Sequence, residues 1–502
     1  MNGASRVLRP VSLAALCGLL LSPGLWVGPG FDAAVYTLAG VSIKNGLMPY
    51  SDIFDNKPPG LYLLNAFGQM ALPVLDPWHV TWLLTAVFAV ATVLVLDRVL
   101  ARLLPPAAAF MLAVVGAIGI ASHPIAYGGG FTESFAVLPL VTALWVLGRG
   151  ASGWRAAAAV GFLSGVACLT SVQAVPVAAV LTVAAIASDA DAREAIRRGL
   201  AAIASGVVLP LLVVAWLGTR GALGDAVDQV AMYNMSYRAA SAGFGFVLAA
   251  SLLILAGLAV PVGVSVARMI NAPRTAGRML WVCLGWAVSE VLILAYENRL
   301  FLHYLIVLVP PLVVLCGPGL TLIVEAARSS VPRSRNIGIL AGAVTAALLV
   351  LSASAVVGLT GITTAAAASE QGVTVQTSDW IKTNTPTTAT VFIWGNDTDI
   401  LLASGRRSYD RHVYQFPMVT AGYWTPAKTE EILAEWATSP PAVVVETPGT
   451  VALFRPNPDP PQPPNYDTLG PLRAFVRAHY RLAATFGFSG DLEDVYVYGP
   501  PR

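Results

Sequence analysis

Residues 78–98 read WHVTWLLTAVFAVATVLVLDR and decide the class of the whole protein. The first nineteen of these residues include no Asp, Glu, Lys or Arg, and the two charged residues, Asp97 and Arg98, close the run. A helix needs about 20 apolar residues to cross the hydrocarbon core of a bilayer. The run therefore predicts a membrane-spanning helix.

Ten further apolar runs flank this one, so we predict a mostly α-helical, polytopic membrane protein with about 11 transmembrane helices. The composition agrees, because 56% of the residues are hydrophobic and 12% are charged, against about 25% charged in soluble proteins. The other predicted spans lie at residues 11–29, 106–122, 131–148, 155–171, 173–187, 199–217, 246–267, 279–296, 302–324 and 337–358.

The spans at 155–171 and 173–187 are short and predict a tight hairpin around Ser171–Gln173. If they formed one long helix, the chain would have ten spans and its C-terminal segment would change sides. Positive charge decides between the two arrangements, because cytoplasmic loops carry an excess of Lys and Arg. Eleven spans with a cytoplasmic N-terminus place 15 basic residues inside and 5 outside before residue 360. We therefore expect a multi-pass protein of the cell inner or plasma membrane with an exocytoplasmic C-terminus.

The chain changes character near residue 360. Residues 360–502 contain 24 charged residues in 143 positions, whereas residues 1–359 contain 34. Three β-like runs, Val391–Trp394, Ala442–Glu446 and Val495–Tyr498, alternate there with helix-like stretches. We therefore divide the chain into a transmembrane body, residues 1–359, and a small exocytoplasmic α/β domain, residues 360–502. The net charge of +2 and the lack of a basic run argue against a nucleic-acid partner.

The first exocytoplasmic loop, at about residues 30–77, is too long for a simple connector. Its candidate functional residues are Asp32, Tyr50, Asp52, Asp55 and Lys57. A carboxylate here can act as a general base on an acceptor hydroxyl or bind a divalent cation, and a lysine can hold a phosphate. The same residues can also be ordinary loop charges that cap helices. The KPPG run at 57–60 favours function, because it opens a helix whose N-terminus suits a phosphate.

Five more candidates lie on the same side of the membrane, near the ends of later spans. They are Glu133, Tyr237, Glu297, Arg299 and His303. Most have a structural alternative: Glu133 begins a span and is favoured there by the helix dipole, and Tyr237 suits the membrane interface. Arg299 can hold a phosphate bidentately, whereas a histidine such as His303 more often packs at an interface than catalyses.

Three stretches of the chain resemble one known family. The first-loop pattern consists of Asp32, Tyr36, Gly46, Pro49, Tyr50, Asp52, Asp55 and Asn56-Lys57-Pro58-Pro59. The other two are RLFLHY at 299–304 with Pro310-Pro311, and VFIWG at 391–395 with SGRR at 404–407 and Arg411. These stretches resemble the C-type integral-membrane glycosyltransferases (GT-C), in particular their bacterial branch similar to protein mannosyltransferases and aminoarabinose transferases (glycosyltransferase family 39-like). The resemblance extends over almost the whole chain.

The resemblance implies an inverting glycosyltransferase that takes a sugar from a polyprenyl-phosphate donor on the outer face of the membrane. In this family the acidic residue just after the first helix is the base, which here is Asp32. The first-loop lysine contacts the donor phosphate, which here is Lys57. The resemblance makes Asp52 and Asp55 supports of the loop or metal ligands.

The chain departs from the family pattern at two places. Many relatives have Asp-Glu where this chain has Asp32-Ala33, and a lysine where it has TSVQ at 170–173. We therefore expect the donor phosphate to rely on Lys57 and Arg299, and a divalent cation as cofactor stays open. The resemblance implies transfer of a hexose or a pentose to a hydroxyl of a glycan, a lipid or a protein of the cell envelope, and leaves the choice among them open.

A second interpretation is a non-catalytic or transport-type membrane protein that binds a lipid-linked sugar. A transporter predicts paired charges at mid-membrane and an internal repeat, and of these the sequence has only Glu290 within a span. One geometric property separates the two interpretations. A transferase requires Asp32 and Lys57 to face a single cavity at the membrane edge.

Overall fold

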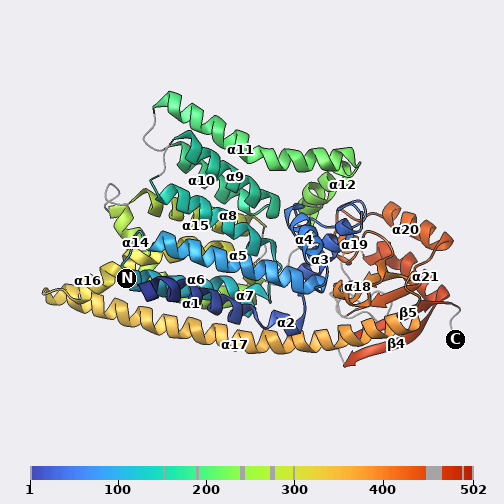
Figure 1. Cartoon of the computed structure of the whole chain (residues 1–502). Helices are drawn as coiled ribbons and strands as arrows, with labels where there is room; N and C mark the ends of the chain where they lie inside the picture. Colours follow the sequence, from blue (N-terminus) through green and yellow to red (C-terminus); the bar gives the residue numbers. More distant parts are fainter. Residues whose placement is uncertain are drawn as a thin grey trace.

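The computed structural model of the chain describes residues 3–150, 153–187, 191–237, 244–271, 277–297, 300–447, 466–488 and 491–499 (Figure 1). Within these ranges, eleven helices match the eleven predicted spans one for one. They are α1 (Gly3–Leu21), α5 (Pro77–Leu100), α6 (Pro106–Ala121), α8 (Thr132–Gly148), α9 (Trp154–Thr170), α10 (Ala174–Ile186), α11 (Ala192–Thr219), α14 (Phe244–Asn271), α15 (Arg278–Glu297), α16 (Leu305–Ala327) and α17 (Pro332–Asn384).

Seven helical segments are long and apolar enough to cross a membrane, and α6, α8, α9 and α10 are shorter apolar helices. The protein is a multi-pass membrane protein. Shorter helical segments connect the long ones: α2 (Gly24–Val27), α3 (Phe31–Lys44), α4 (Gly60–Ala71), α7 (His123–Ala126), α12 (Leu223–Val227), the π-helix η1 (Asp228–Tyr233), α13 (Asn234–Tyr237) and the 3-10 turn η3 (Leu302–Tyr304).

The two short predicted spans are separate helices, since α9 ends at Thr170 and α10 begins at Ala174. The break falls at Ser171–Gln173, as the sequence predicted. The N-terminus and the C-terminal sheet lie at opposite ends of the helical bundle (Figure 1). An odd number of crossings gives this arrangement, so it agrees with eleven spans rather than ten.

α16 is the central helix of the bundle and α11 is a peripheral one. Within the most apolar window of each segment, 72% of the α16 residues are buried in the protein, against 11% of the α11 residues. α11 packs against α9 through small residues, because a methyl group added at Gly161 or Gly165 would collide with the backbone of Ala202 or Gly206. α11 is therefore held to the bundle mainly by its close backbone approach to α9.

Two helices make up most of the segment between the first two spans. α4 begins directly after the two prolines at 58 and 59, as predicted. The hydroxyls of Thr37 on α3 and Thr81 on α5 lie 2.9 Å apart, and Asn65 Oδ1 on α4 accepts a hydrogen bond from Thr81 at 2.8 Å. Buried hydrogen bonds thus hold α3 and α4 against α5 and give this segment a fixed position on the bundle.

The C-terminal segment contains a five-stranded mixed sheet with the order β2-β1-β3-β5-β4. β1 pairs in parallel with β2 and β3, whereas β5 pairs antiparallel with β3 and β4. The strands are β1 (Thr390–Trp394), β2 (Arg407–Ser408), β3 (Val443–Glu446), β4 (Tyr480–Phe488) and β5 (Asp491–Tyr498). The helical segments are α18 (Asp399–Ser404), α19 (Phe416–Val419), α20 (Pro426–Thr438), the 3-10 turn η4 (Tyr466–Leu469) and α21 (Gly470–His479). The small α/β unit that the sequence predicted is confirmed, with β2 and β4 as additions.

α17 joins the bundle to the sheet as one continuous helix of 53 residues (Figure 1). At 1.5 Å per residue it is about 80 Å long, well beyond the thickness of about 30 Å of a hydrocarbon core. It contains the predicted last span and the first helix expected in the tail. The division at residues 359 and 360 falls inside this helix and stays a prediction.

Candidate active site

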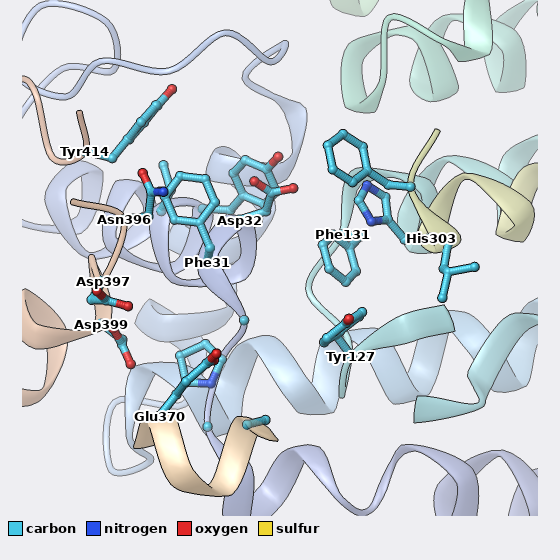
Figure 2. A pocket seen from close by; sticks show the side chains of 18 of the residues that line it. Phe31, Asp32, Tyr127, Phe131, His303, Glu370, Asn396, Asp397, Asp399 and Tyr414 are labelled. Carbon is cyan, nitrogen blue, oxygen red and sulfur yellow. The ribbon is translucent and has the colours of Figure 1, made fainter. Parts of the chain in front are cut away.

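A cavity of about 670 Å³ lies where the bundle, α3, α17 and the C-terminal unit meet. We call the part of the chain after α17 the tail. Figure 2 shows the tail residues Asn396, Asp397, Asp399 and Tyr414 on one side, Phe131 and His303 on the other, and Asp32 between them. We call the side with Asp32, Lys57 and His303 the body wall, and the side with Asn396, Asp397 and Asp399 the tail wall. Glu370 of α17 lines the cavity as well.

Asp32 and Lys57 both line this cavity, which is the juxtaposition that the transferase interpretation requires. Asp32 lies in the first turn of α3, where the helix dipole favours a negative charge. Among the residues that the structure describes, none makes a hydrogen bond or ion pair with either the Asp32 carboxylate or the Lys57 ammonium. Both charged groups are therefore available to a ligand.

The two charges act on each other across the cavity. Burial raises the pKa of the Asp32 carboxyl, and the positive charge of Lys57 lowers it by a smaller amount. Burial lowers the pKa of Lys57, but the acidic groups Tyr304, Glu133 and Asp32 raise it by more, so the amine stays positively charged. The result is a protonated lysine beside a carboxylate of raised proton affinity.

The backbone of Lys57 is held from behind by two tyrosines. The hydroxyls of Tyr50 and Tyr62 lie 2.8 and 3.1 Å from the Lys57 carbonyl oxygen. Tyr50 has a φ of +71°, a left-handed conformation that strains a residue with a side chain. Its N–H donates to the Ile53 carbonyl at 2.8 Å, and its carbonyl accepts from Gln229 at 2.7 Å. Tyr50 itself does not line the cavity, so it contributes to the site by holding the backbone of Lys57.

Asp55 lies beside Lys57 and is engaged by hydroxyl groups. Its carboxylate accepts hydrogen bonds from Tyr62 and from Tyr414 of the tail, the latter at 3.2 Å. Burial raises the pKa of Asp55 to about 6, although the hydrogen bond from Tyr62 opposes this effect. Asp55 therefore connects the first segment, which is the part of the chain between α1 and α5, to the tail at the edge of the cavity.

Glu133 and His303 form a second polar pair on the body side. Glu133 is buried and accepts a hydrogen bond from the Thr132 hydroxyl at 2.9 Å, and His303 Nε2 lies 4.0 Å from Glu133 Oε2. The His303 ring stacks on Phe131 at 4.1 Å and on Phe301 at 5.5 Å between centroids. His303 lines the cavity, and Glu133 supports it and adds to the negative charge around Lys57.

The remaining predicted residues divide between the cavity and its surroundings. Tyr237 lines the cavity and stacks on Tyr233 at 5.2 Å. Glu297 lies outside the cavity lining and accepts from Gln173 Nε2 at 2.6 Å. Asp52 is exposed and accepts from the Met48 N–H at 2.6 Å, so it stabilises a local turn away from the cavity. Arg299 lies outside the described residues.

The tail wall is the part of the site that sequence reasoning missed. Asn396, Asp397 and Asp399 follow β1 and line the cavity, together with Glu370, Gln371 and Thr374 of α17. The available signal was the polar run GNDTD at 395–399 directly after a buried strand. Ligands of α/β sheets gather at the carboxyl ends of parallel strands, and β1 is such a strand.

The side chains of the first segment do not fit a metal ion. Both carboxylate oxygens of Asp55 accept hydrogen bonds from tyrosines. The Asp52 carboxylate accepts a hydrogen bond from the Met48 N–H, outside the cavity. A hard divalent cation requires several convergent oxygen ligands. The described part of the chain contains no group of three or more His, Cys, Asp or Glu residues arranged to hold one. The expectation of Asp52 and Asp55 as metal ligands therefore lacks a suitable donor set.

No protein-family model and no curated protein sequence matches the chain. Its structure is similar to that of ArnT from Cupriavidus metallidurans bound to undecaprenyl phosphate, with a TM-score of 0.60 and 14% identity over 99% of this chain and 98% of that chain. It is also similar to the oligosaccharyltransferase AglB from Archaeoglobus fulgidus in complex with an inhibitory peptide and a dolichol-phosphate. Here the TM-score is 0.52 and the identity 13%, over 96% of this chain and 74% of that chain. The chain has the fold of the GT-C glycosyltransferases, from its first span to its C-terminal sheet.

Proposed function

We propose that this chain is an inverting glycosyltransferase that moves a sugar from a polyprenyl-phosphate donor to a hydroxyl acceptor. The observation that carries the proposal is the position of Asp32 and Lys57 in one cavity, each without a hydrogen-bond or ion-pair partner among the described residues. A cation and a base in one cavity suit a ligand with a phosphate and a partner with a hydroxyl. The similar structures of ArnT with undecaprenyl phosphate and AglB with dolichol-phosphate support a lipid-linked donor.

The reaction follows from the two charged groups. Lys57 holds the donor phosphate, and the acceptor oxygen attacks C1 of the sugar from the face opposite that phosphate. The C1–oxygen bond to the phosphate breaks, its electron pair leaves with the polyprenyl phosphate, and the acceptor proton passes to Asp32. Burial raises the pKa of Asp32 and thereby makes it a stronger base than an exposed aspartate. Lys57 offsets the negative charge that develops on the leaving phosphate.

The distribution of basic residues supports a reaction on the outer face of the cytoplasmic membrane. The cavity lies at the end of the bundle that carries the C-terminal sheet, away from the N-terminus (Figure 1). In the eleven-span arrangement, the segments on the same side as the N-terminus hold 15 of the 20 basic residues before residue 360, which is the pattern of cytoplasmic loops. The acceptor is then a glycan, a lipid or a protein of the cell envelope, and the bilayer supplies the donor.

The test uses the full-length chain in proteoliposomes with a panel of polyprenyl-phosphate sugars. Mannose, arabinofuranose, aminoarabinose and galacturonic acid donors are each offered, with and without envelope extract as acceptor. We expect one donor to be converted to polyprenyl phosphate, and we expect Lys57→Ala to weaken binding of undecaprenyl phosphate by about 10- to 100-fold. Lys44→Ala is the matched control, because Lys44 is exposed at the far end of α3.

Two outcomes contradict the proposal in different ways. The wild-type protein could bind undecaprenyl phosphate through Lys57 and yet convert no donor, even with extract. That result would show a non-catalytic protein that binds the lipid phosphate. Wild-type protein that shows no binding, or whose binding is the same in Lys57→Ala and Lys44→Ala, does not use this cavity for a phosphate.

A further inference from the structure

Three parts of the chain meet around Phe54 and Asp55, at the edge of the cavity. The Phe54 N–H donates to the Arg411 carbonyl of the tail at 2.7 Å, and the Asp55 N–H donates to Gln229 Oε1 of η1 at 3.1 Å. Gln229 also donates through Nε2 to the Tyr50 carbonyl at 2.7 Å. The tail, η1 and the first segment therefore form one interlocked unit beside the cavity.

The Asp55 carboxylate connects the tail to Lys57 through hydroxyl groups. The Tyr414 hydroxyl donates to Asp55 Oδ1 at 3.2 Å, and the Tyr62 hydroxyl donates to Asp55 Oδ2. The Tyr62 hydroxyl also lies 3.1 Å from the Lys57 carbonyl oxygen, to which Tyr50 donates at 2.8 Å. A continuous path of hydrogen bonds thus runs from the tail to the backbone of the lysine.

The Tyr62 hydroxyl has one proton for two acceptors, Asp55 Oδ2 and the Lys57 carbonyl. A second donor on the Asp55 carboxylate weakens its hold on that proton, because each hydrogen bond to a carboxylate disperses its charge. Tyr414 is such a second donor. With Tyr414 in place, the Tyr62 proton is more available to the Lys57 carbonyl, which strengthens the hold on the loop that carries the lysine.

We propose that Tyr414 is a positioning residue for donor binding, through which the tail holds the phosphate-binding Lys57 in place by way of Asp55 and Tyr62. The inference rests on the proposed function, in which Lys57 binds the donor phosphate. It makes the C-terminal unit a part of the donor site. Tyr414 also lines the cavity, but its hydroxyl donates to Asp55, so removing this hydroxyl is expected to weaken donor binding through the position of Lys57.

The chain offers a closely matched control in Tyr423. Its hydroxyl donates to Asp228 Oδ2 at 2.5 Å, so it too joins the tail to a carboxylate of the body. The rings of Tyr414 and Tyr423 both contact the Phe54 ring, each with 6.0 Å between centroids. Both tyrosines therefore hold the tail against the body, but among the hydrogen bonds of the described residues only that of Tyr414 leads towards Lys57.

The experiment compares Tyr414→Phe with Tyr423→Phe in the full-length chain. We expect Tyr414→Phe to weaken binding of undecaprenyl phosphate by about five- to tenfold, and Tyr423→Phe to change it by less than about twofold. Both variants are expected to lower the thermal unfolding midpoint by similar amounts, because each loses one hydrogen bond to a carboxylate. When the concentration of an active donor is varied, Tyr414→Phe raises KM and leaves kcat unchanged, since Asp32 is not disturbed.

The outcomes separate this inference from the proposed function. Equal losses of binding in the two tyrosine variants would show that Tyr414 serves docking alone. Binding that is lost in Lys57→Ala and normal in Tyr414→Phe would overturn the positioning role and keep the phosphate site. Binding that is unchanged in Lys57→Ala would refute the phosphate site itself, whatever the tyrosine variants do.

Discussion

The body wall and the tail wall of the cavity both contain carboxyl groups, but their electrostatic surroundings differ. On the body wall, Asp32 faces the cation Lys57, which opposes the effect of burial on its pKa. On the tail wall, burial raises the pKa of Asp397 to about 6 and that of Asp399 to about 7, and the neighbouring carboxylates raise both. A carboxyl beside a cation keeps its charge and can accept a proton in a reaction, whereas grouped carboxyls become neutral easily and act as hydrogen-bonding groups. On this basis we propose that the chemistry takes place on the body wall and that the tail wall recognises uncharged hydroxyl groups.

The largest expected effect comes from replacing one carboxyl on each wall. Asp32→Asn is expected to lower kcat by about 10²- to 10⁴-fold, the usual contribution of a general base. Asp399→Asn is expected to lower kcat by less than about threefold, because an amide resembles the neutral carboxyl that hydrogen-bonds there. The measurement is the rate of polyprenyl phosphate release at saturating donor, together with binding of undecaprenyl phosphate. Both variants should keep that binding.

Asp52→Asn serves as the control for this pair, since Asp52 is exposed and outside the cavity. A normal kcat in Asp32→Asn would show that another group takes the acceptor proton. A loss in Asp399→Asn as large as that in Asp32→Asn would remove the distinction between the two walls.

The helices and most strands of the fold follow from the sequence, because apolar length and residue propensity act locally. The spans and the break at Ser171–Gln173 were predicted, and so were β1, β3 and the second half of β5. β4 was missed because the run YRLAATFGF at 480–488 starts at the end of a helix and its strand character depends on pairing with β5. The continuity of α17 was missed because its middle, from 359 to 374, lacks the hydropathy of a span and contains Gly361 and Gly372, which are typical of helix ends.

The site was predictable where its residues are adjacent in the chain. Asp32 and Lys57 lie in one segment whose pattern resembles a known family, and the structure places both on one cavity. The tail wall and Tyr414 come from residues hundreds of positions away, and no local pattern connects them to that segment. Asp55 illustrates the difference: the sequence identified the carboxylate, but its partner Tyr414 is 359 residues away and follows only from the folded contacts.

A smaller effect is expected from glycines behind the two walls. Gly130 and Gly405 both have positive φ, at +89° and +63°. A methyl group at Gly130 would lie 2.6 Å from the Cβ of Ala33, next to Asp32, whereas the space at Gly405 is open to 4 Å. Gly405→Ala is expected to destabilise by about 1–2 kcal/mol, the strain of a left-handed alanine. Gly130→Ala is expected to destabilise by about 2–4 kcal/mol, because overpacking adds to that strain.

The unfolding midpoints of the two alanine variants in detergent decide this comparison. A larger shift for Gly130→Ala means that the body wall is built by tight packing behind Asp32. Equal shifts would mean that the backbone strain alone matters and that the contact with Ala33 relaxes without loss.

The smallest expected effect is a pH dependence that originates in the tail wall. As the pH rises through 6 and 7, Asp397 and Asp399 ionise and their negative charge repels a bound phosphate. Binding of undecaprenyl phosphate is therefore expected to weaken over this interval, by about threefold more in the wild type than in the Asp397→Asn/Asp399→Asn variant, since salt screens part of the repulsion. Protons on the phosphate itself, on Asp55 and on other groups titrate in both proteins, so the difference between the two binding curves isolates the tail wall.

The same carboxyls make the stability of the protein depend on pH. Because the folded carboxyls bind protons more tightly than unfolded ones, the wild type should also lose stability as the pH rises from 4 to 7, and the variant should lose less. Identical binding curves in the two proteins would show that the tail wall does not sense the charge of the donor.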